Sequence, residues 1–226
     1  MKWTTAAALT VAAAAYLAWR NTSTQDPAAT DPGVPDVSAD TGEPDQLPTT
    51  LETIAVTLTP STYDSGSTSD AQAQRNVRAF LDMISYSEGT NGPDGYRAMF
   101  GYPLPDRIAP SLADHPRRKF TFTNKAGKTL TTSAAGRYQF LISTWDELAA
   151  SLQLPDFGPD SQDKACIELI RQRGALNDVR AGRITDAITK CSKTWASLPG
   201  AGYDQPERKL NWLLAQYSGA GGSMEA

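Results

Sequence analysis

Apolar residues recur at helical spacing upstream of the middle of the chain. The positions i, i+3, i+4 and i+7 of one face are Val77, Phe80, Leu81 and Ile84. This spacing predicts an amphipathic helix with one buried stripe. Ser69, with Gln72 three residues later, has the pattern of a capping box and predicts where the helix begins. Gly89 and the Asn91-Gly92-Pro93 run predict that it ends at Glu88.

Two segments of different character follow this helix. Residues 89–116 are spaced by Gly and Pro and include several aromatic side chains. The segment is too long for an idle loop in a compact domain, so we expect a wall of a binding site or a mobile lid. Residues 119–132 then alternate around Asn124-Lys125-Ala126-Gly127, which predicts a β-hairpin.

Helical patterns fill the rest of the chain. We expect a helix capped by Ser143 and Asp146, a second from about Ser161 to Arg173, a third carrying Ile184 to Cys191, and a fourth from Asp204 to Gly219. In the fourth, Pro206 suits the first helical position and Glu207 completes an Asp-type capping box. One helix, a hairpin and four helices predict an α+β domain with a cleft between its hairpin side and its helical side.

The N-terminus carries an uncharged stretch between Lys2 and Arg20. It runs from Trp3 to Trp19, is 17 residues long, and contains eight Ala and three Thr. This length is at the lower limit for a membrane span, and the terminal Trp residues suit the two interfaces. We expect residues 1–20 to be an uncleaved signal anchor that places the rest of the chain in the periplasm. A cleaved signal peptide and a buried helix are the alternatives.

Charge divides the remaining chain into two parts. Residues 21–72 contain nine Asp and Glu and no Lys or Arg, and they are rich in Pro, Thr and Ser. Such a composition buries too little apolar surface to fold, so we interpret it as a disordered tether. Residues 73–226 contain 19 Lys and Arg against 16 Asp and Glu, a net charge of +3. This mildly basic domain suits an anionic polymer as its partner.

Glu88 is the candidate for chemistry, because a packed helix delivers it to the edge of a loop. A carboxyl group that is held rigidly and partly desolvated has a raised pKa and can act as a general acid near neutral pH. The alternative is a solvated Glu at the surface.

The cysteines and the histidine give no further site. Cys166 and Cys191 both lie on apolar helix faces, where they are either a disulfide or two buried thiols. His115, the one histidine, has no partner cluster and is interpreted as structural. We therefore expect no metal and no cofactor.

Three stretches, in this order, resemble the phage-lambda-type endolysins. They are Ser87-Glu88-Gly89-Thr90, Ala135-Gly136-Arg137-Tyr138-Gln139 and residues 195–203, which end in Gly202-Tyr203. Residues 114–117, 161–163 and 173–176 are similar to that family too, so the resemblance covers about residues 73–222. It implies a lysozyme-like α+β fold and a peptidoglycan lytic transglycosylase, which leaves a 1,6-anhydro product. It also implies that Glu88 is catalytic and that Tyr138, Gln139 and Tyr203 contact the substrate.

This chain departs from the family pattern in three places. The family has a histidine shortly after the catalytic glutamate, whereas no histidine lies between Glu88 and His115 here. A second family histidine falls near Arg208, and the N-terminal anchor and tether are additional. Neither of the two family positions therefore holds a histidine in this chain.

The carboxylates agree with transglycosylation independently. Glycoside hydrolysis needs two carboxyl groups, and the second comes from the hairpin side in lysozymes of this shape. No Asp or Glu lies between Arg117 and Ser143. Asp94, Asp106 or Asp114 would have to supply it, which leaves a hydrolysing lysozyme as one alternative. A tethered glycan-binding protein without activity is another.

The partners and the biological role follow from this interpretation. We expect peptidoglycan strands as the substrate, a membrane contact through residues 3–19, and no nucleic acid. The activity would serve host-cell lysis or penetration of the cell wall.

Overall fold

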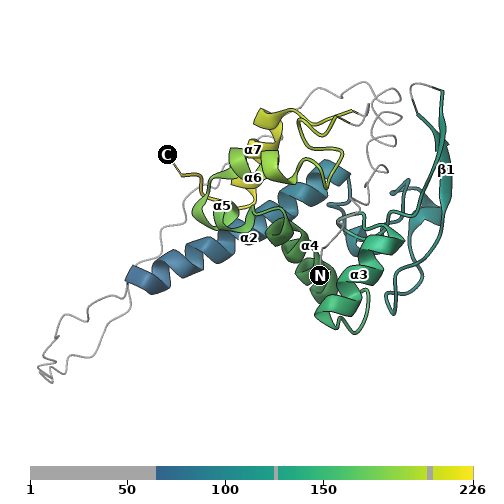
Figure 1. The fold of residues 1–226 in the computed structure, drawn as a ribbon, viewed down its shortest axis with the longest axis horizontal. Coiled ribbons are helices and arrows are strands. Elements are labelled where there is room, and N and C mark those ends of the chain that lie inside the picture. Colours follow the sequence, from purple (N-terminus) through teal and green to yellow (C-terminus); the bar gives the residue numbers. More distant parts are fainter. Residues whose placement is uncertain (1–64, 125–126, 203–205, 226) are drawn as a thin grey trace, which may run out of the picture.

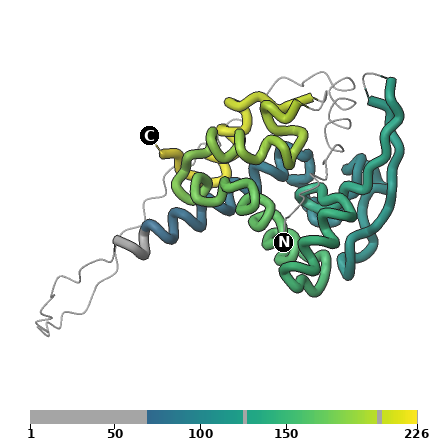
Figure 2. The backbone as a smooth tube through the Cα atoms, viewed as in Figure 1, coloured from purple at the N-terminus to yellow at the C-terminus, as the bar shows by residue number. Residues whose placement is uncertain are grey.

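A long helix, α2 (Ser65–Glu88), runs through the structure, and several of the later helices pack along it (Figure 1). This computed structural model describes residues 65–124, 127–202 and 206–225. Helices α4 (Pro159–Gln172), α5 (Leu176–Ala181) and α7 (Leu210–Gly219) contact α2 directly. Helix α3 (Ile142–Leu152) packs on α4, and α6 (Ile184–Cys191) packs on α5 and α7. The hairpin of β1 (Phe120–Thr123) and β2 (Thr129–Thr132) stands at the edge far from the start of α2 (Figures 1 and 2).

The apolar stripe of α2 forms the centre of the core. Phe80, Met83 and Ile84 are fully buried, which confirms the helical period predicted from the sequence. Burial of each such side chain contributes about 1.5–3 kcal/mol. The same core contains an aromatic group of Phe140, Trp145 and Phe157, with ring centroids 5.6 Å apart for Phe140 and Trp145 and 4.5 Å apart for Trp145 and Phe157.

The C-terminal end of α2 is closed by two backbone hydrogen bonds. Gly89 has a positive φ of 72°, its N–H donates to the carbonyl of Tyr86 at 3.2 Å, and the N–H of Thr90 donates to the carbonyl of Ser85 at 2.9 Å. This is a Schellman motif, which glycine permits because it has no Cβ. The predicted helix end at Glu88 is confirmed.

The segment after α2 returns to the hairpin side through backbone pairing. The N–H of Phe100 donates to the carbonyl of Ala134 at 3.0 Å, and the N–H of Gly136 donates to the carbonyl of Ala98 at 2.6 Å. The ring of Phe100 also lies 5.1 Å from that of Phe122 on β1. Residues 98–102 are therefore held between the hairpin and the loop that follows it.

The predicted hairpin is confirmed, with Phe120 opposite Thr132 and Thr123 opposite Thr129. In its turn, the N–H of Gly127 donates to the carbonyl of Asn124 at 3.0 Å. Two strands alone bury little surface. Aromatic contacts with Phe100 and the Arg107 guanidinium, 4.3 Å from the centroid of the Phe120 ring, attach the hairpin to the domain.

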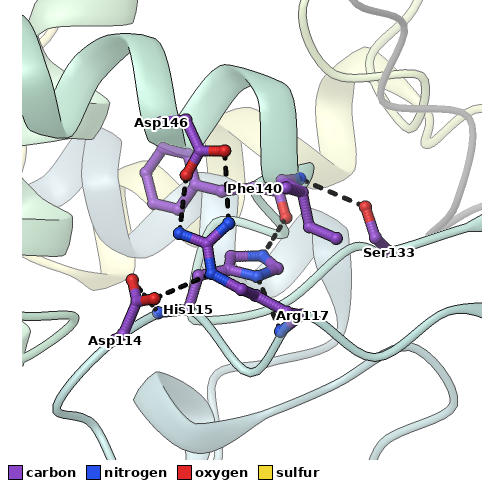
Figure 3. A network of polar contacts seen from close by, with 7 residues as sticks. Asp114, His115, Arg117, Ser133, Phe140 and Asp146 are labelled. Carbon is purple, nitrogen blue, oxygen red and sulfur yellow. Dashed lines mark hydrogen bonds and ion pairs between the residues drawn. The ribbon is translucent and has the colours of Figure 1, made fainter.

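His115 has a structural role, as its isolation in the sequence predicted (Figure 3). Its Nδ1 accepts the backbone N–H of Arg117 at 3.1 Å, so its hydrogen is on Nε2, which lies 3.0 Å from the carbonyl oxygen of Phe140. Burial lowers the pKa of His115 and keeps the ring neutral. The Arg117 guanidinium also bonds Asp114 at 2.8 Å and Asp146 at 2.8 Å, which ties this segment to α3.

The predicted starts of two helices are wrong because their capping residues have other partners or positions. Helix α2 already begins at Ser65, so Ser69 lies inside it, and residues 65–72 are helical rather than part of a tether. Helix α3 begins at Ile142 without a side-chain cap, because the carboxylate of Asp146 binds Arg117 instead.

The last helix was predicted to begin at Asp204 with Pro206 as its first residue, and this is also wrong. Helix α7 begins at Leu210. The carboxylate of Glu207 accepts the N–H groups of Gly200 at 2.8 Å and Gly202 at 2.9 Å, so it serves the preceding turn rather than a helix cap. The described part of the chain after the hairpin also holds five helices, not four, because α5 was not predicted.

Of the two alternatives for the cysteines, a disulfide or two buried thiols, the structure has two buried thiols. Cys166 on α4 and Cys191 on α6 are both buried and free. The predicted signal anchor and most of the predicted tether lie outside the described residues. Within those residues, no helix combines the length and the apolar composition that a membrane crossing requires.

We predict that Gly136→Ala lowers the free energy of unfolding by more than the backbone strain at this position accounts for. Gly136 has φ 79°, and an added Cβ would lie 2.3 Å from Oε1 of Gln162 and 2.9 Å from Cζ of Phe157. We expect a loss of about 3 kcal/mol, of which about 1 kcal/mol is left-handed strain. The control is Gly174→Ala, which has a similar φ of 67° with nothing within 4 Å and should lose only about 1 kcal/mol. Equal losses in denaturant unfolding would contradict the packing role of Gly136.

Candidate active site

The carboxyl group of Glu88 is buried where α2 ends. The side chain is 4% exposed, and its Oε1 accepts a hydrogen bond from the Ser197 hydroxyl at 2.7 Å. Within the described residues, Oε2 is also buried and has no hydrogen-bond partner. One oxygen is therefore held in place, and the other is available to carry a transferable proton.

The surroundings of Glu88 favour its neutral form. Burial raises the pKa of Glu88 from 4.5 to about 7, against the opposing effects of the Ser197 hydrogen bond and the positive charge of Arg208. The C-terminal end of a helix also carries partial negative charge, which disfavours a carboxylate there. A carboxylic acid with this pKa is protonated in much of the population at neutral pH and can act as a general acid.

A small cavity lies in front of this carboxyl group. Its lining comes from the end of α2, from residues 98–102 and from the loop after the hairpin. The lining residues are Glu88, Thr90, Met99, Phe100, Gly101, Tyr102 and Gln139. The lining combines the apolar side chains of Met99 and Phe100 with hydroxyl and amide groups, which are the kinds of group that bind sugars. Glu88 is the single carboxyl group among these lining residues.

The loop of residues 135–139 is held rigidly beside Glu88. The Thr90 hydroxyl donates to the carbonyl of Arg137 at 2.5 Å, which joins the end of α2 to this loop. Oε1 of Gln162, which is fully buried, accepts the N–H of Arg137 at 2.8 Å. Gln139 has a positive φ of 52°, and its side-chain amide donates to the carbonyl of Gly136 at 2.9 Å. These hydrogen bonds fix the position of the loop next to the cavity.

The third side of the site comes from residues 195–202 and 206–208. The indole N–H of Trp195 donates to the carbonyl of Tyr138 at 3.2 Å, which places Ser197 against Glu88. The backbone N–H of Arg208 donates to the carbonyl of Ser197 at 2.8 Å, and its guanidinium lies 4.8 Å from the centroid of the Trp212 ring. Ser197 thus contacts Glu88 with its side chain and Arg208 with its backbone.

The structure brings two of the four predicted site residues together. Glu88 and Gln139 line the same cavity. Tyr138 is 1% exposed in the core, and its hydroxyl donates to Asp163 at 2.6 Å, so its ring does not line that cavity. Tyr203 lies outside the described residues. The catalytic role of Glu88 and the substrate contacts of Tyr138, Gln139 and Tyr203 all remain predictions, and the buried position of Tyr138 gives its prediction no support.

Sequence reasoning did not single out several residues that build the site. Thr90 and Ser197 lie inside the recognised stretches 87–90 and 195–203, but no periodicity shows which of these side chains meet. Tyr102 also lines the cavity. Its hydroxyl oxygen packs closely on Gly92, because a Cβ added to Gly92 would lie 2.4 Å from it. The Gly and Pro spacing of residues 89–116 and their aromatic side chains indicated a wall there.

The three candidates for a second carboxylate are occupied elsewhere. Asp94 pairs with Arg97 at 3.6 Å, Asp106 with Arg107 at 3.2 Å, and Asp114 with Arg117 at 2.8 Å. None of the three lines the cavity of Glu88. The described residues also contain no group of three or more His, Cys, Asp or Glu side chains arranged to hold a metal ion.

Comparison with known proteins gives consistent relatives. A family model described as Endolysin matches residues 78–224. The endolysin of Escherichia phage P2 is 46% identical over 157 residues, which cover 66% of this chain and 94% of that protein. The endolysin of Escherichia phage lambda is 42% identical over 149 residues, which cover 65% of this chain and 92% of that protein.

Solved structures agree with the sequence matches. A structure of bacteriophage lambda lysozyme complexed with a chitohexasaccharide has a TM-score of 0.60 and 41% identity, covering 67% of this chain and 97% of that one. A second structure of lysozyme from bacteriophage lambda has a TM-score of 0.56 and 39% identity. The lysozyme-like fold and the resemblance drawn from the sequence motifs are confirmed, and the chain belongs to the endolysin family.

Proposed function

We propose that this protein cleaves the β-1,4 bond between N-acetylmuramic acid and N-acetylglucosamine of peptidoglycan by lytic transglycosylation. Membership of the endolysin family makes it a lysozyme-like enzyme that degrades the cell wall. The finer assignment depends on one observation, that Glu88 is the single carboxyl group lining its cavity in the described residues. The chitohexasaccharide in complex with bacteriophage lambda lysozyme supports a glycan chain as the occupant here.

In the first step, Glu88 acts as a general acid. The proton on its Oε2 moves to the glycosidic oxygen, the bond from that oxygen to C1 of the muramic acid breaks, and the electron pair stays with the leaving sugar. The buried, neutral carboxyl group suits this donation, since its pKa is about 7. The positive charge that develops at C1 then faces the newly formed carboxylate.

In the second step, the same group acts as a general base. The 6-hydroxyl of the muramic acid attacks C1, its proton returns to Oε2 of Glu88, and a 1,6-anhydro ring closes. This hydroxyl is tethered to the reacting carbon, so proximity replaces the carboxylate that would activate water in a hydrolase. One carboxyl group completes the cycle.

We predict that Glu88→Gln abolishes cleavage of purified sacculi while the fold is kept. The amide preserves the shape and the bond to Ser197 but has no acidic proton to transfer. We expect a loss of at least about 100-fold, the lower range for removal of a general acid. The matched control is Glu147→Gln, on the exposed face of α3, which should cleave as the parent does. A Glu88→Gln enzyme within tenfold of the parent would show that another group is the acid.

We also predict a pH-dependent gain in stability for Glu88→Gln. The folded-state pKa of about 7 lies above the ordinary 4.5, so the folded chain keeps a proton that the unfolded chain has lost. Stability of the parent is therefore fully present below about pH 4.5 and falls as the pH rises toward 7. The gain from the amide should be small at about pH 5 and reach on the order of 3 kcal/mol at about pH 8. Urea unfolding at the two pH values measures it, and a pH-independent difference would contradict the raised pKa.

We further propose that residues 1–20 form an uncleaved anchor in the inner membrane, with the catalytic domain in the periplasm. The length between Trp3 and Trp19 supports a span, while the eight Ala and three Thr make its insertion weak. A weak anchor allows later release of the full-length enzyme. An endolysin held until release and an enzyme attached to a virion or envelope are both consistent with such an anchor.

We predict that replacing four alanines between Ala6 and Ala15 with leucine retains the enzyme in the membrane fraction. Each replacement adds apolar surface and makes insertion more favourable. In the parent, fractionation should show full-length protein moving to the soluble periplasm with time or when the membrane potential is dissipated. A soluble form whose sequence begins well beyond Lys2 would replace the anchor with a cleaved signal peptide.

A further inference from the structure

Two serine hydroxyls stand in line behind the carboxyl group of Glu88. Oγ of Ser197 lies 2.7 Å from Oε1 of Glu88 and 3.0 Å from Oγ of Ser87. The Ser87 hydroxyl donates in turn to the carbonyl of Ile84 at 2.8 Å. Ser87 and Ser197 are fully buried, so solvent does not supply alternative partners for them.

The two contacts of Ser197 exclude each other. A hydroxyl carries one hydrogen, and both contacts need Ser197 as the donor, because the hydrogen of Ser87 is engaged with Ile84. Glu88 and Ser87 therefore compete for the same hydrogen atom. Which of them receives it depends on which is the stronger acceptor.

We propose that Ser197 and Ser87 are positioning residues that form a two-position hydrogen-bond switch behind Glu88, in which the Ser197 hydrogen points to Glu88 when the carboxyl group is ionised and turns to Ser87 when it is protonated. The inference rests on the proposed function, because it concerns the acid and base roles of Glu88. It concerns the rotation of one O–H bond, and no covalent bond changes.

The switch follows from the charge of the acceptor. A hydrogen bond to an ionised carboxylate is roughly twice as strong as one between neutral groups. When the proton is on Oε2, Oε1 is a neutral carbonyl oxygen, and the Ser87 oxygen becomes a comparable acceptor. Ser197 therefore stabilises the carboxylate by donating a hydrogen bond to it. Ser87 stabilises the acid form, because it accepts the Ser197 hydroxyl hydrogen when the carboxyl group is neutral.

This arrangement suits a group that must be an acid and a base in one catalytic cycle. As Glu88 gives its proton to the glycosidic oxygen, the Ser197 hydrogen turns toward the new negative charge. When the 6-hydroxyl returns the proton, the hydrogen turns back to Ser87. Ser197 thus stabilises the carboxylate and Ser87 stabilises the acid, while burial remains the largest effect on the pKa of Glu88.

Other ionisable groups that face Glu88 are Arg208, whose charge lowers the pKa of Glu88, the buried thiol of Cys166, and the hydroxyl of Tyr102 in the cavity lining. Neither serine substitution removes any of these groups. A change in the titration of Glu88 in a serine variant therefore reports the lost hydroxyl.

The test is a titration of Glu88 by NMR in the full-length chain, with carbon-13 in the glutamate carboxyl groups and Glu88→Gln used to assign the signal. Ser197→Ala should raise the pKa of Glu88 by about one pH unit, because the carboxylate loses a charge-assisted hydrogen bond. Ser87→Ala should lower it, because the acid form loses its competing acceptor. The matched control is Ser85→Ala, on the same helix, whose hydroxyl likewise donates three residues back, to Asp82 at 2.7 Å. It should leave the pKa unchanged.

The opposite signs distinguish a switch from a merely structural role. If both serine variants raise the pKa, Ser87 donates toward Ser197 and the switch is wrong. If neither moves it relative to Ser85→Ala, the hydroxyls only fill space. The sign for Ser87 is the deciding one, and Ser87→Cys, whose sulfur is a weaker hydrogen-bond acceptor, gives the same test if Ser87→Ala fails to fold.

Cleavage rates then connect the switch to catalysis. The alkaline limb of kcat/KM should move up in pH for Ser197→Ala and down for Ser87→Ala, and kcat of Ser197→Ala should fall about tenfold with KM unchanged. The NMR titration needs no activity. Opposite pKa changes in an enzyme that releases only reducing ends would therefore support the switch and refute transglycosylation. Changes in pKa of the same sign, or none, in an enzyme that releases anhydro products would refute the switch alone.

Discussion

Burial of one carboxyl group at the end of a helix is the constraint on which this structure depends. Leaving Glu88 charged in its cavity is unfavourable, and its pKa of about 7 expresses that cost. The folded protein tolerates it because α2 and the stripe around Phe80 and Ile84 hold the helix end rigidly. The same burial that lowers stability at alkaline pH gives the carboxyl group a proton to donate near neutrality.

Three segments that are far apart in sequence meet at this helix end, mostly through backbone groups. Thr90 binds the carbonyl of Arg137, Trp195 binds that of Tyr138, and Arg208 binds that of Ser197. In these contacts the acceptors are backbone carbonyl groups, so the positions of the three segments are fixed through their main chain. Residues that contact a substrate directly must in general be held rigidly by the residues behind them.

The sequence predicted those features that local pattern controls. The apolar stripe and Gly89 gave the course and end of α2, and the alternation around Gly127 gave the hairpin. Prediction failed where tertiary contacts override local signals: Glu207 binds the amides of Gly200 and Gly202 instead of capping a helix, and Asp146 binds Arg117. The motif containing Ser197 was recognised, but its contact with Glu88 spans 109 residues and has no local signature.

The central claim is that a single carboxyl group cleaves the glycan without water as the acceptor. Digestion of sacculi in water enriched in oxygen-18, followed by mass spectrometry of the muropeptides, tests it most directly. Hydrolysis places an oxygen atom from water at each new reducing end, whereas attack by the 6-hydroxyl does not. Products that carry no label and are lighter than the hydrolysis products by one water would bear the claim out. Oxygen-18 at the new reducing ends would contradict it and require a second group that activates water.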